Sequence, residues 1–62
     1  MTTEDIKCMD PNILVSIINL KLRDYYSNLE GLGDDMDISI EVLEDSLKKG
    51  GFIYNKSTNQ FR

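Results

Sequence analysis

Residues 27–54 read SNLEGLGDDMDISIEVLEDSLKKGGFIY, and their pattern decides the fold of this chain. Two short segments with apolar residues at helical spacing are joined by a tight connection, and a glycine pair then leads into an extended segment. This order of elements is typical of a helix-turn-helix unit followed by a small wing. The stretch therefore predicts a mainly α fold that is helix-turn-helix-like, with a short C-terminal β-hairpin in a mini winged-helix-like arrangement.

The first helix of this stretch is predicted over residues 28–35. Ser27 and Glu30 have the spacing of a capping box, in which the hydroxyl and the carboxylate each accept a free backbone N–H at the helix start. Gly33 falls where helix-turn-helix units need a small residue, because the two helices approach closely there. The apolar residues of this helix recur at spacings of three and four on one face, and they are Leu29, Leu32 and Met36.

The second helix of the stretch is predicted over residues 40–49. Ser39 is a good N-cap, the first turn is acidic, and two lysines in the last turn suit the helix dipole. Gly50 and Gly51 supply the left-handed residue that ends the helix. A plain helical hairpin, without the geometry that reads a DNA groove, is the alternative left open. The residues expected between the two helices are Met36, Ile38, Leu43 and Leu47.

The segment after the glycine pair predicts a hairpin. Residues 52–54 have high strand propensity, turn-forming residues follow at 55–59, and residues 60–62 are able to return antiparallel. Phe52 and Tyr54 share one face of the predicted strand, and Phe61 joins them over the helices. An isolated hairpin is only marginally stable in water, so this one is expected to lean on the helical body.

A further helix is predicted upstream, from Asp10 and Pro11 to about Tyr25, which makes three helices in all. Asp10 is a good N-cap, and proline fits the first helical position, where its missing N–H costs nothing. One narrow face of this helix is polar, and it consists of Asn12, Ser16, Asn19 and Arg23. Most of the remaining surface is apolar, over roughly twice the ordinary arc of about 100°. We therefore expect this helix to be covered on several sides.

The composition restricts the classes of function. The 62 residues are expected to form one small domain, with residues 1–9 as a loose N-terminal arm and residues 10–62 as the folded body. The chain has no histidine and a single cysteine, so the commonest general base, the usual zinc ligands and an internal disulfide are all missing. So short a chain also has little room for a concave substrate pocket. We expect no enzymatic activity, no cofactor and no metal.

The predicted location is the cytoplasm. The N-terminal sequence is polar and acidic, unlike a signal peptide, and the apolar-rich run over residues 13–22 is too short to span a bilayer. The formal net charge of −4 also argues against binding to anionic membrane surfaces. We therefore expect no membrane association.

Several segments spread along the chain form one pattern: Asp10-Pro11-Asn12, Ser16, Asn19, Lys21-Leu22-Arg23-Asp24, Tyr26-Ser27-Asn28-Leu29-Glu30, Gly51, Tyr54 and Asn59-Gln60-Phe61. This pattern resembles a small bacterial family of uncharacterised proteins, a domain of unknown function found as free-standing chains of about this length. Gly31 and Gly33 depart from it, and each glycine costs a helix about 1 kcal/mol relative to alanine. The resemblance implies a free-standing protein, and it implies neither an activity nor site residues.

A nucleic-acid-binding helix-turn-helix regulator is the alternative function that the predicted shape raises. The outward face of the helix over residues 40–49 would be the recognition surface, and apart from Ile40 it carries Glu41, Glu44, Asp45 and Lys48. Protein–DNA affinity depends on lysines and arginines that neutralise phosphates, so three carboxylates would repel the DNA backbone. We therefore expect no specific binding to nucleic acid.

The over-wide apolar surface of the helix over residues 11–25 predicts a protein partner. The residues expected to remain uncovered are Leu14, Val15, Ile18, Leu22 and Tyr25, and the polar residues expected beside them at the interface are Asn19 and Arg23. We predict a homodimer through this helix, because a two-fold pairing covers the same surface on both copies. The alternative is that Ile6 and Met9 of the N-terminal arm fold back over it. The sequence thus predicts a small, non-enzymatic interaction or regulatory domain, whose other protein partners remain unidentified.

Overall fold

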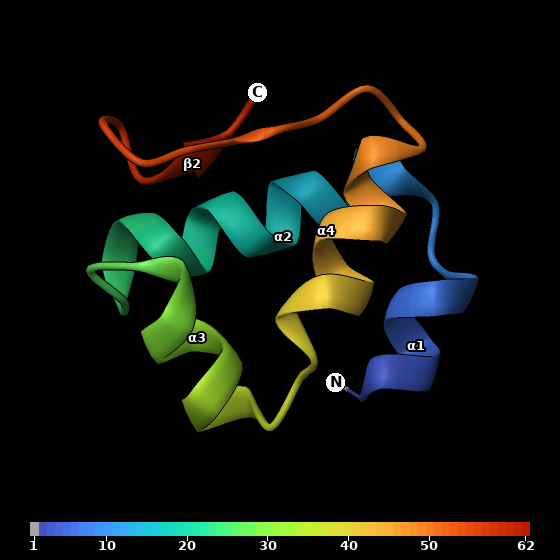
Figure 1. The fold of residues 1–62 in the computed structure, drawn as a ribbon, viewed down its shortest axis with the longest axis horizontal. Helices are drawn as coiled ribbons and strands as arrows, with labels where there is room; N and C mark the ends of the chain where they lie inside the picture. The colour runs from blue at the N-terminus through green and yellow to red at the C-terminus, as the bar shows by residue number, and fades with distance from the viewer. Residues whose placement is uncertain (1) are drawn as a thin grey trace.

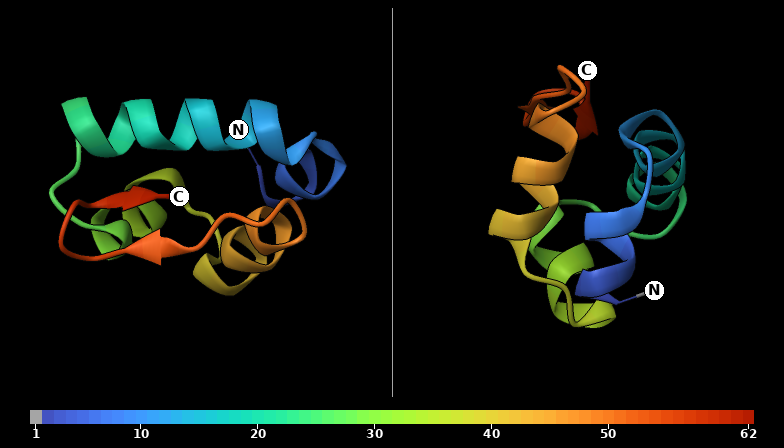
Figure 2. Two further views of the ribbon diagram at one scale, coloured as in Figure 1. Left: turned by 90° about the horizontal axis from the view of Figure 1, so that it is seen from above. Right: turned by 90° about the vertical axis from the view of Figure 1, so that its right-hand side faces the viewer.

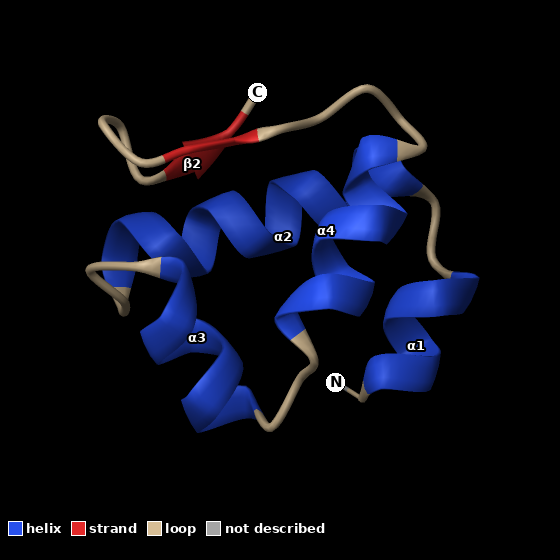
Figure 3. Cartoon of the chain, viewed as in Figure 1, coloured by secondary structure: helices blue, strands red, loops and turns tan. Residues whose placement is uncertain are grey.

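A computed structural model describes residues 2–62, which form four helices followed by a two-stranded antiparallel hairpin (Figure 1). The elements in chain order are α1 (Thr3–Cys8), α2 (Pro11–Asp24), α3 (Leu29–Met36), α4 (Ile40–Lys48), β1 (Tyr54–Asn55) and β2 (Gln60–Phe61). The colouring in Figure 3 shows that most of the chain is helical and that the strands are confined to its C-terminal end. The prediction of a mainly α fold with a C-terminal hairpin is confirmed.

The N-terminal segment corrects the prediction of three helices and a loose arm. Thr2 and Asp5 form a capping box, in which the Thr2 hydroxyl accepts the Asp5 N–H and the Asp5 carboxylate accepts the Thr2 N–H. The α1 helix packs against α4, and its residue Ile6 has no exposed surface. A six-residue helix with one buried side chain is too short to show a helical period in the sequence. It is held in place by tertiary contact.

The predicted start of α2 is confirmed. Asp10 caps the helix, since its Oδ1 atom accepts the N–H of Asn12 at 2.8 Å, and Pro11 occupies the first helical position. The start of α3 differs from the prediction by one residue. Its N-cap is Asn28, whose Oδ1 accepts the N–H of Gly31 at 2.7 Å, so Ser27 does not cap this helix.

The connection between α3 and α4 is three residues long. Asp37 adopts the left-handed conformation at φ 55°, and Ser39 caps α4 by accepting the N–H of Val42. The predicted close approach at Gly33 is confirmed, because a Cβ atom there would lie 2.4 Å from Cδ1 of Ile40. Any larger side chain at Gly33 would force the Ile40 side chain or the two helices to shift.

The path from α4 into the hairpin runs through Gly51, which has φ 87°. The N–H of Phe52 then donates to the carbonyl of Leu47 at 3.0 Å, which ties the extended segment to the end of α4. In the hairpin Tyr54 faces Phe61, and their ring centroids are 5.3 Å apart. The predicted meeting of these aromatic residues is thereby confirmed.

One hydrophobic core connects all four helices and the hairpin. Its buried residues are Ile6, Leu14, Ile18, Leu22, Leu29, Leu32, Ile38, Leu43, Leu47 and Phe61. Three of the four residues predicted between α3 and α4 are buried, whereas Met36 is only partly buried at the edge of the core. No helix within residues 2–62 combines the length and the apolar character needed to cross a membrane.

Candidate interaction surface

The α2 helix has one covered face and one open face. Figure 2 shows α2 along one side of the molecule, with α3, α4 and the hairpin all on its other side. The covered face carries Leu14, Ile18 and Leu22, which are at most 2 % exposed. The prediction that these three residues remain available to a partner is wrong, because Ile6 of α1, the apolar residues of α4 and Phe61 of β2 complete the core around them.

The other predicted contact residues of α2 lie in different environments. Val15 is partly buried against the core, so it offers little surface to a partner. Tyr25 is 74 % exposed just after the end of α2, and the Nζ atom of Lys21 lies 6.0 Å from the centre of its ring. Of the seven residues predicted for the interface, only Tyr25 and Arg23 are exposed.

Asn19 is a positioning residue for the hairpin. Its Nδ2 atom donates to the carbonyl of Phe61 at 3.0 Å, and its Oδ1 atom accepts the Phe61 N–H at 2.8 Å. The side-chain amide therefore pairs with the outer edge of β2 as a neighbouring strand would. The predicted role of Asn19 in a contact surface is not compatible with this arrangement, because both of its hydrogen-bonding atoms are already engaged within the chain.

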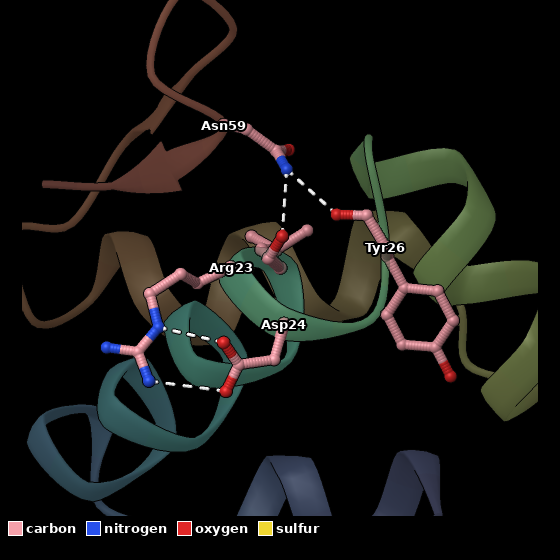
Figure 4. Close-up of polar contacts among 5 residues, drawn as sticks. Arg23, Asp24, Tyr26 and Asn59 are labelled. Atoms are coloured by element: carbon pink, nitrogen blue, oxygen red, sulfur yellow. Dashed lines mark hydrogen bonds and ion pairs between the residues drawn. The ribbon is translucent and has the colours of Figure 1, made fainter.

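Asn59 fixes the other end of the hairpin. It adopts φ 55°, and its Nδ2 atom donates to the carbonyls of Leu22 and Tyr26 at 3.1 and 3.0 Å (Figure 4). Its Oδ1 atom accepts the hydroxyl of Tyr54 at 2.7 Å. The carbonyls at the end of α2 lack partners within the helix, so Asn59 satisfies one of them from the hairpin turn. The two asparagines thus hold the hairpin against α2 at two points.

We expect Asn19→Ala to lower the free energy of unfolding by about 1–3 kcal/mol, because it leaves the Phe61 N–H and carbonyl without partners at a partly buried edge. Urea denaturation followed by circular dichroism measures this loss. Asn12→Ala, at an exposed position of the same helix, is the control and should change stability little. Equal stability of the two variants would show that the hairpin does not depend on the Asn19 amide.

The end of α2 also holds an exposed ion pair. The Nε and Nη2 atoms of Arg23 donate to the two carboxylate oxygens of Asp24 at 3.0 and 3.2 Å (Figure 4). The hydrogen bond to Asp24 raises the pKa of the Arg23 guanidinium, and the same bond lowers the pKa of the Asp24 carboxyl. Arg23 is therefore accessible to a partner, as predicted, but its charge is largely balanced by Asp24.

A second polar contact joins the segment after α2 to α3. The hydroxyl of Tyr26 donates to the Asp35 carboxylate at 2.5 Å. This hydrogen bond raises the pKa of the Tyr26 hydroxyl, since losing the proton would place two negative charges side by side. The contact therefore helps to fix α3 beneath the end of α2 at neutral pH.

The open face of α2 carries an apolar stripe that sequence analysis did not single out. Ile13, Ile17 and Leu20 follow one another at spacings of four and three, so they lie on one face of the helix. Ile13 is 57 % and Leu20 is 48 % exposed, and Ile17 between them is partly exposed. These residues belong to the wide apolar arc that the sequence predicts for this helix. Nothing in the sequence indicated which part of that arc the rest of the chain would cover.

The charges around this stripe differ from those on the rest of the surface. Lys21, Arg23 and Asp24 flank it and together carry one net positive charge. The span from Glu30 to Asp45, by contrast, holds seven carboxylates and no lysine or arginine, and all seven are exposed. Of these two faces, the stripe on α2 is therefore the one where apolar surface is not surrounded by repelling carboxylates.

Residues 8–61 match a protein family described as a domain of unknown function (DUF4250). The searches of curated proteins and of solved structures found no match. The family match begins at Cys8, the last residue of α1, and extends through α2, α3 and α4 to Phe61 in β2. It confirms the resemblance to a domain of unknown function that the sequence pattern indicated. Because the match covers nearly all of its 62 residues, this chain belongs to the DUF4250 family.

Proposed function

We propose that this protein is a small, non-enzymatic, cytoplasmic interaction domain that self-associates through the open face of α2. The observation that carries the proposal is the row of Ile13, Ile17 and Leu20, which no part of residues 2–62 covers fully. A second copy offers the same row, and a two-fold axis pairs the two rows without any further adaptation. The proposed interface therefore lies on the opposite face of α2 from the one that the sequence predicted.

The charges favour a second copy over this face. Two stripes brought together place Lys21 and the balanced Arg23–Asp24 pair of each copy near one end of the interface and the Asp10 carboxylate near the other. Contact through α3 and α4 would instead bring seven carboxylates of each copy together. Like charges in contact cost free energy, so the α2 face is the favoured site of self-association.

The exposed area limits the strength of the dimer. Fully burying an aliphatic side chain contributes roughly 1.5–3 kcal/mol, so covering the exposed half of Ile13 or Leu20 contributes roughly 1 kcal/mol, and covering the smaller exposed part of Ile17 contributes less. The six side chains of a dimer therefore contribute at most about 6 kcal/mol before the costs of association are subtracted. The loss of rotational and translational freedom weakens the association further. The dimer is therefore expected to form in a concentration-dependent way.

We expect sedimentation and light scattering to show a mass that rises from 7.1 kDa towards twice that value as concentration increases from roughly 10 µM to 1 mM. Leu20→Glu should keep the mass at the monomer value, because it places an unpaired carboxylate of each copy within the apolar contact. Thr58→Glu adds the same charge at an exposed position of the hairpin turn and should dimerise as wild type does. A monomeric wild-type chain at 1 mM, or equal dimerisation of both variants, would overturn the proposal.

A nucleic-acid role is the second candidate, and two features of α3 and α4 favour it. The three-residue connection with Asp37 in the left-handed conformation, and the close approach of α3 and α4 at Gly33, are features of helix-turn-helix-like units. The electrostatics oppose it, because Glu41, Glu44 and Asp45 are all exposed on α4. We therefore retain self-association as the proposed function.

We expect no sequence-selective binding of duplex DNA at about 0.15 M salt, because the carboxylates of α4 repel phosphates. Fluorescence anisotropy with labelled mixed-sequence and genomic fragments measures the affinity. Non-specific binding alone has a Kd of about 10⁻⁴ to 10⁻⁶ M, so a submicromolar and sequence-selective isotherm would establish the nucleic-acid role instead.

A further inference from the structure

The two edges of the hairpin are not equivalent. On the β2 edge, both backbone groups of Phe61 are bonded to Asn19. Ile53 and Arg62 exchange both of their backbone hydrogen bonds at 2.8 and 2.9 Å, so the next pair, Tyr54 and Phe61, points its backbone groups away from the partner strand. The N–H and carbonyl of Tyr54 consequently lie on the outer edge of β1, and neither has a hydrogen-bond partner within residues 2–62.

The open edge of β1 faces towards α4. Two residues before Tyr54, on the same edge, the N–H of Phe52 donates to the carbonyl of Leu47 in α4. In the view from above in Figure 2, β2 lies between α2 and β1, so β1 is the strand farther from α2. The backbone of Tyr54 is therefore available from the side of the molecule opposite to the stripe on α2.

A hollow of about 260 Å³ adjoins this edge. Four residues of the hairpin region line one side of it, namely Phe52, Ile53, Tyr54 and Phe61. The other side is α4, which contributes Glu44, Asp45 and Lys48. The hollow thus combines aromatic and aliphatic residues of the hairpin region, an open strand edge and a wall with two carboxylates and one ammonium group.

We propose that this edge binds an extended, basic segment of a partner protein by β-strand addition. One residue of the incoming segment would exchange both backbone hydrogen bonds with Tyr54, as the Asn19 amide does with Phe61 on the other edge. A side chain of the segment would enter the hollow beside Phe52 and Ile53. The site is separate from the α2 stripe and does not depend on self-association.

The charge of α4 determines which charge the bound segment carries. Glu44 and Asp45 stand on the wall of the hollow, and five further exposed carboxylates continue along α3 and the start of α4 without a single lysine or arginine. Two lysines, Lys48 and Lys49, oppose them at the end of α4, so residues 30–49 keep a net charge of −5 (seven carboxylates against two ammonium groups). A basic segment is attracted to this surface, whereas an acidic one is repelled before it reaches the strand edge.

The test uses a capped hexapeptide of alternating valine and lysine, titrated into the full-length, ¹⁵N-labelled protein. We expect the Tyr54 amide to show one of the largest chemical-shift changes and to exchange its hydrogen more slowly in the complex. The first control peptide carries N-methyl groups on alternate residues, so it retains its charge but loses the N–H groups of one edge. The second control peptide has glutamate in place of each lysine, which reverses its charge. Neither control peptide should change the chemical shift or the hydrogen exchange of the Tyr54 amide.

Two variants of α4 form a matched pair for the charge. Glu44→Lys reverses a carboxylate on the wall of the hollow and should weaken peptide binding about fivefold, the effect of a modest surface ion pair. Glu41→Lys makes the same change one turn earlier, outside the hollow, and should have a smaller effect. The proposal is overturned by the absence of shifts at millimolar peptide, by equal weakening in both variants, by equal binding of the N-methylated peptide, or by shifts confined to α2.

Discussion

Ile18→Asp is expected to leave the chain unfolded, whereas Ile13→Asp on the same helix leaves it folded. Ile18 has no exposed surface, so aspartate there would place a carboxylate among Leu14, Leu22 and the other core residues. A domain of this length has a total stability of only about 3–9 kcal/mol. The lost apolar burial alone is about 1.5–3 kcal/mol, and an unpaired buried carboxylate costs several kcal/mol more.

Ile13 provides the control because the substitution is identical and the environment is not. It is 57 % exposed and lies in the first turn of α2, where a negative charge suits the helix dipole. Circular dichroism should therefore show wild-type helix content for Ile13→Asp and a largely unfolded spectrum for Ile18→Asp. A folded Ile18→Asp variant would show that the covered face of α2 is the opposite one to that described here.

Leu47→Ala is expected to lower the free energy of unfolding by about 2–5 kcal/mol. Leu47 is fully buried in the last turns of α4, the helix that packs against both α1 and α2, and its carbonyl accepts the N–H of Phe52. Truncation to alanine leaves a cavity at the point where α4 meets the start of the hairpin segment. The loss is a large share of the total stability of so small a domain.

Urea denaturation of Leu47→Ala and Leu20→Ala measures this effect with the same chemical change at two sites. Leu20 is 48 % exposed on the open face of α2, so its truncation at concentrations where the protein is monomeric should cost far less. If Leu47→Ala unfolds at the same urea concentration as wild type, the assignment of Leu47 to the centre of the core is incorrect.

These variants also separate the two faces of α2. Changes at Ile18 act on folding, and changes at Ile13 or Leu20 act on association, although all three residues belong to one short helix. Leu22 was predicted for the interface by its apolar character alone. A charged substitution there would abolish dimerisation only by unfolding the chain. Measurements of mass therefore need circular dichroism on the same samples.

The sequence by itself determined the elements whose signals are local. The cap at Asp10 with Pro11 after it, the cap at Ser39 and the left-handed Gly51 each depend on a few neighbouring residues, and all three predictions hold. The need for a small residue at Gly33 was also visible in the sequence, because helix pairs joined by a short turn have few ways to approach each other.

Only the tertiary structure decided which part of α2 is covered. An apolar arc of roughly twice the ordinary width is compatible with more than one choice of buried face, and hydrophobic burial has no direction of its own. The choice was made by distant residues: Ile6 of α1, which a helix of six residues could not reveal by its period, and the amides of Asn19 and Asn59, which hold the hairpin against one side of α2. In the fold that these long-range contacts build, Ile18 is buried and Ile13 and Leu20 are exposed.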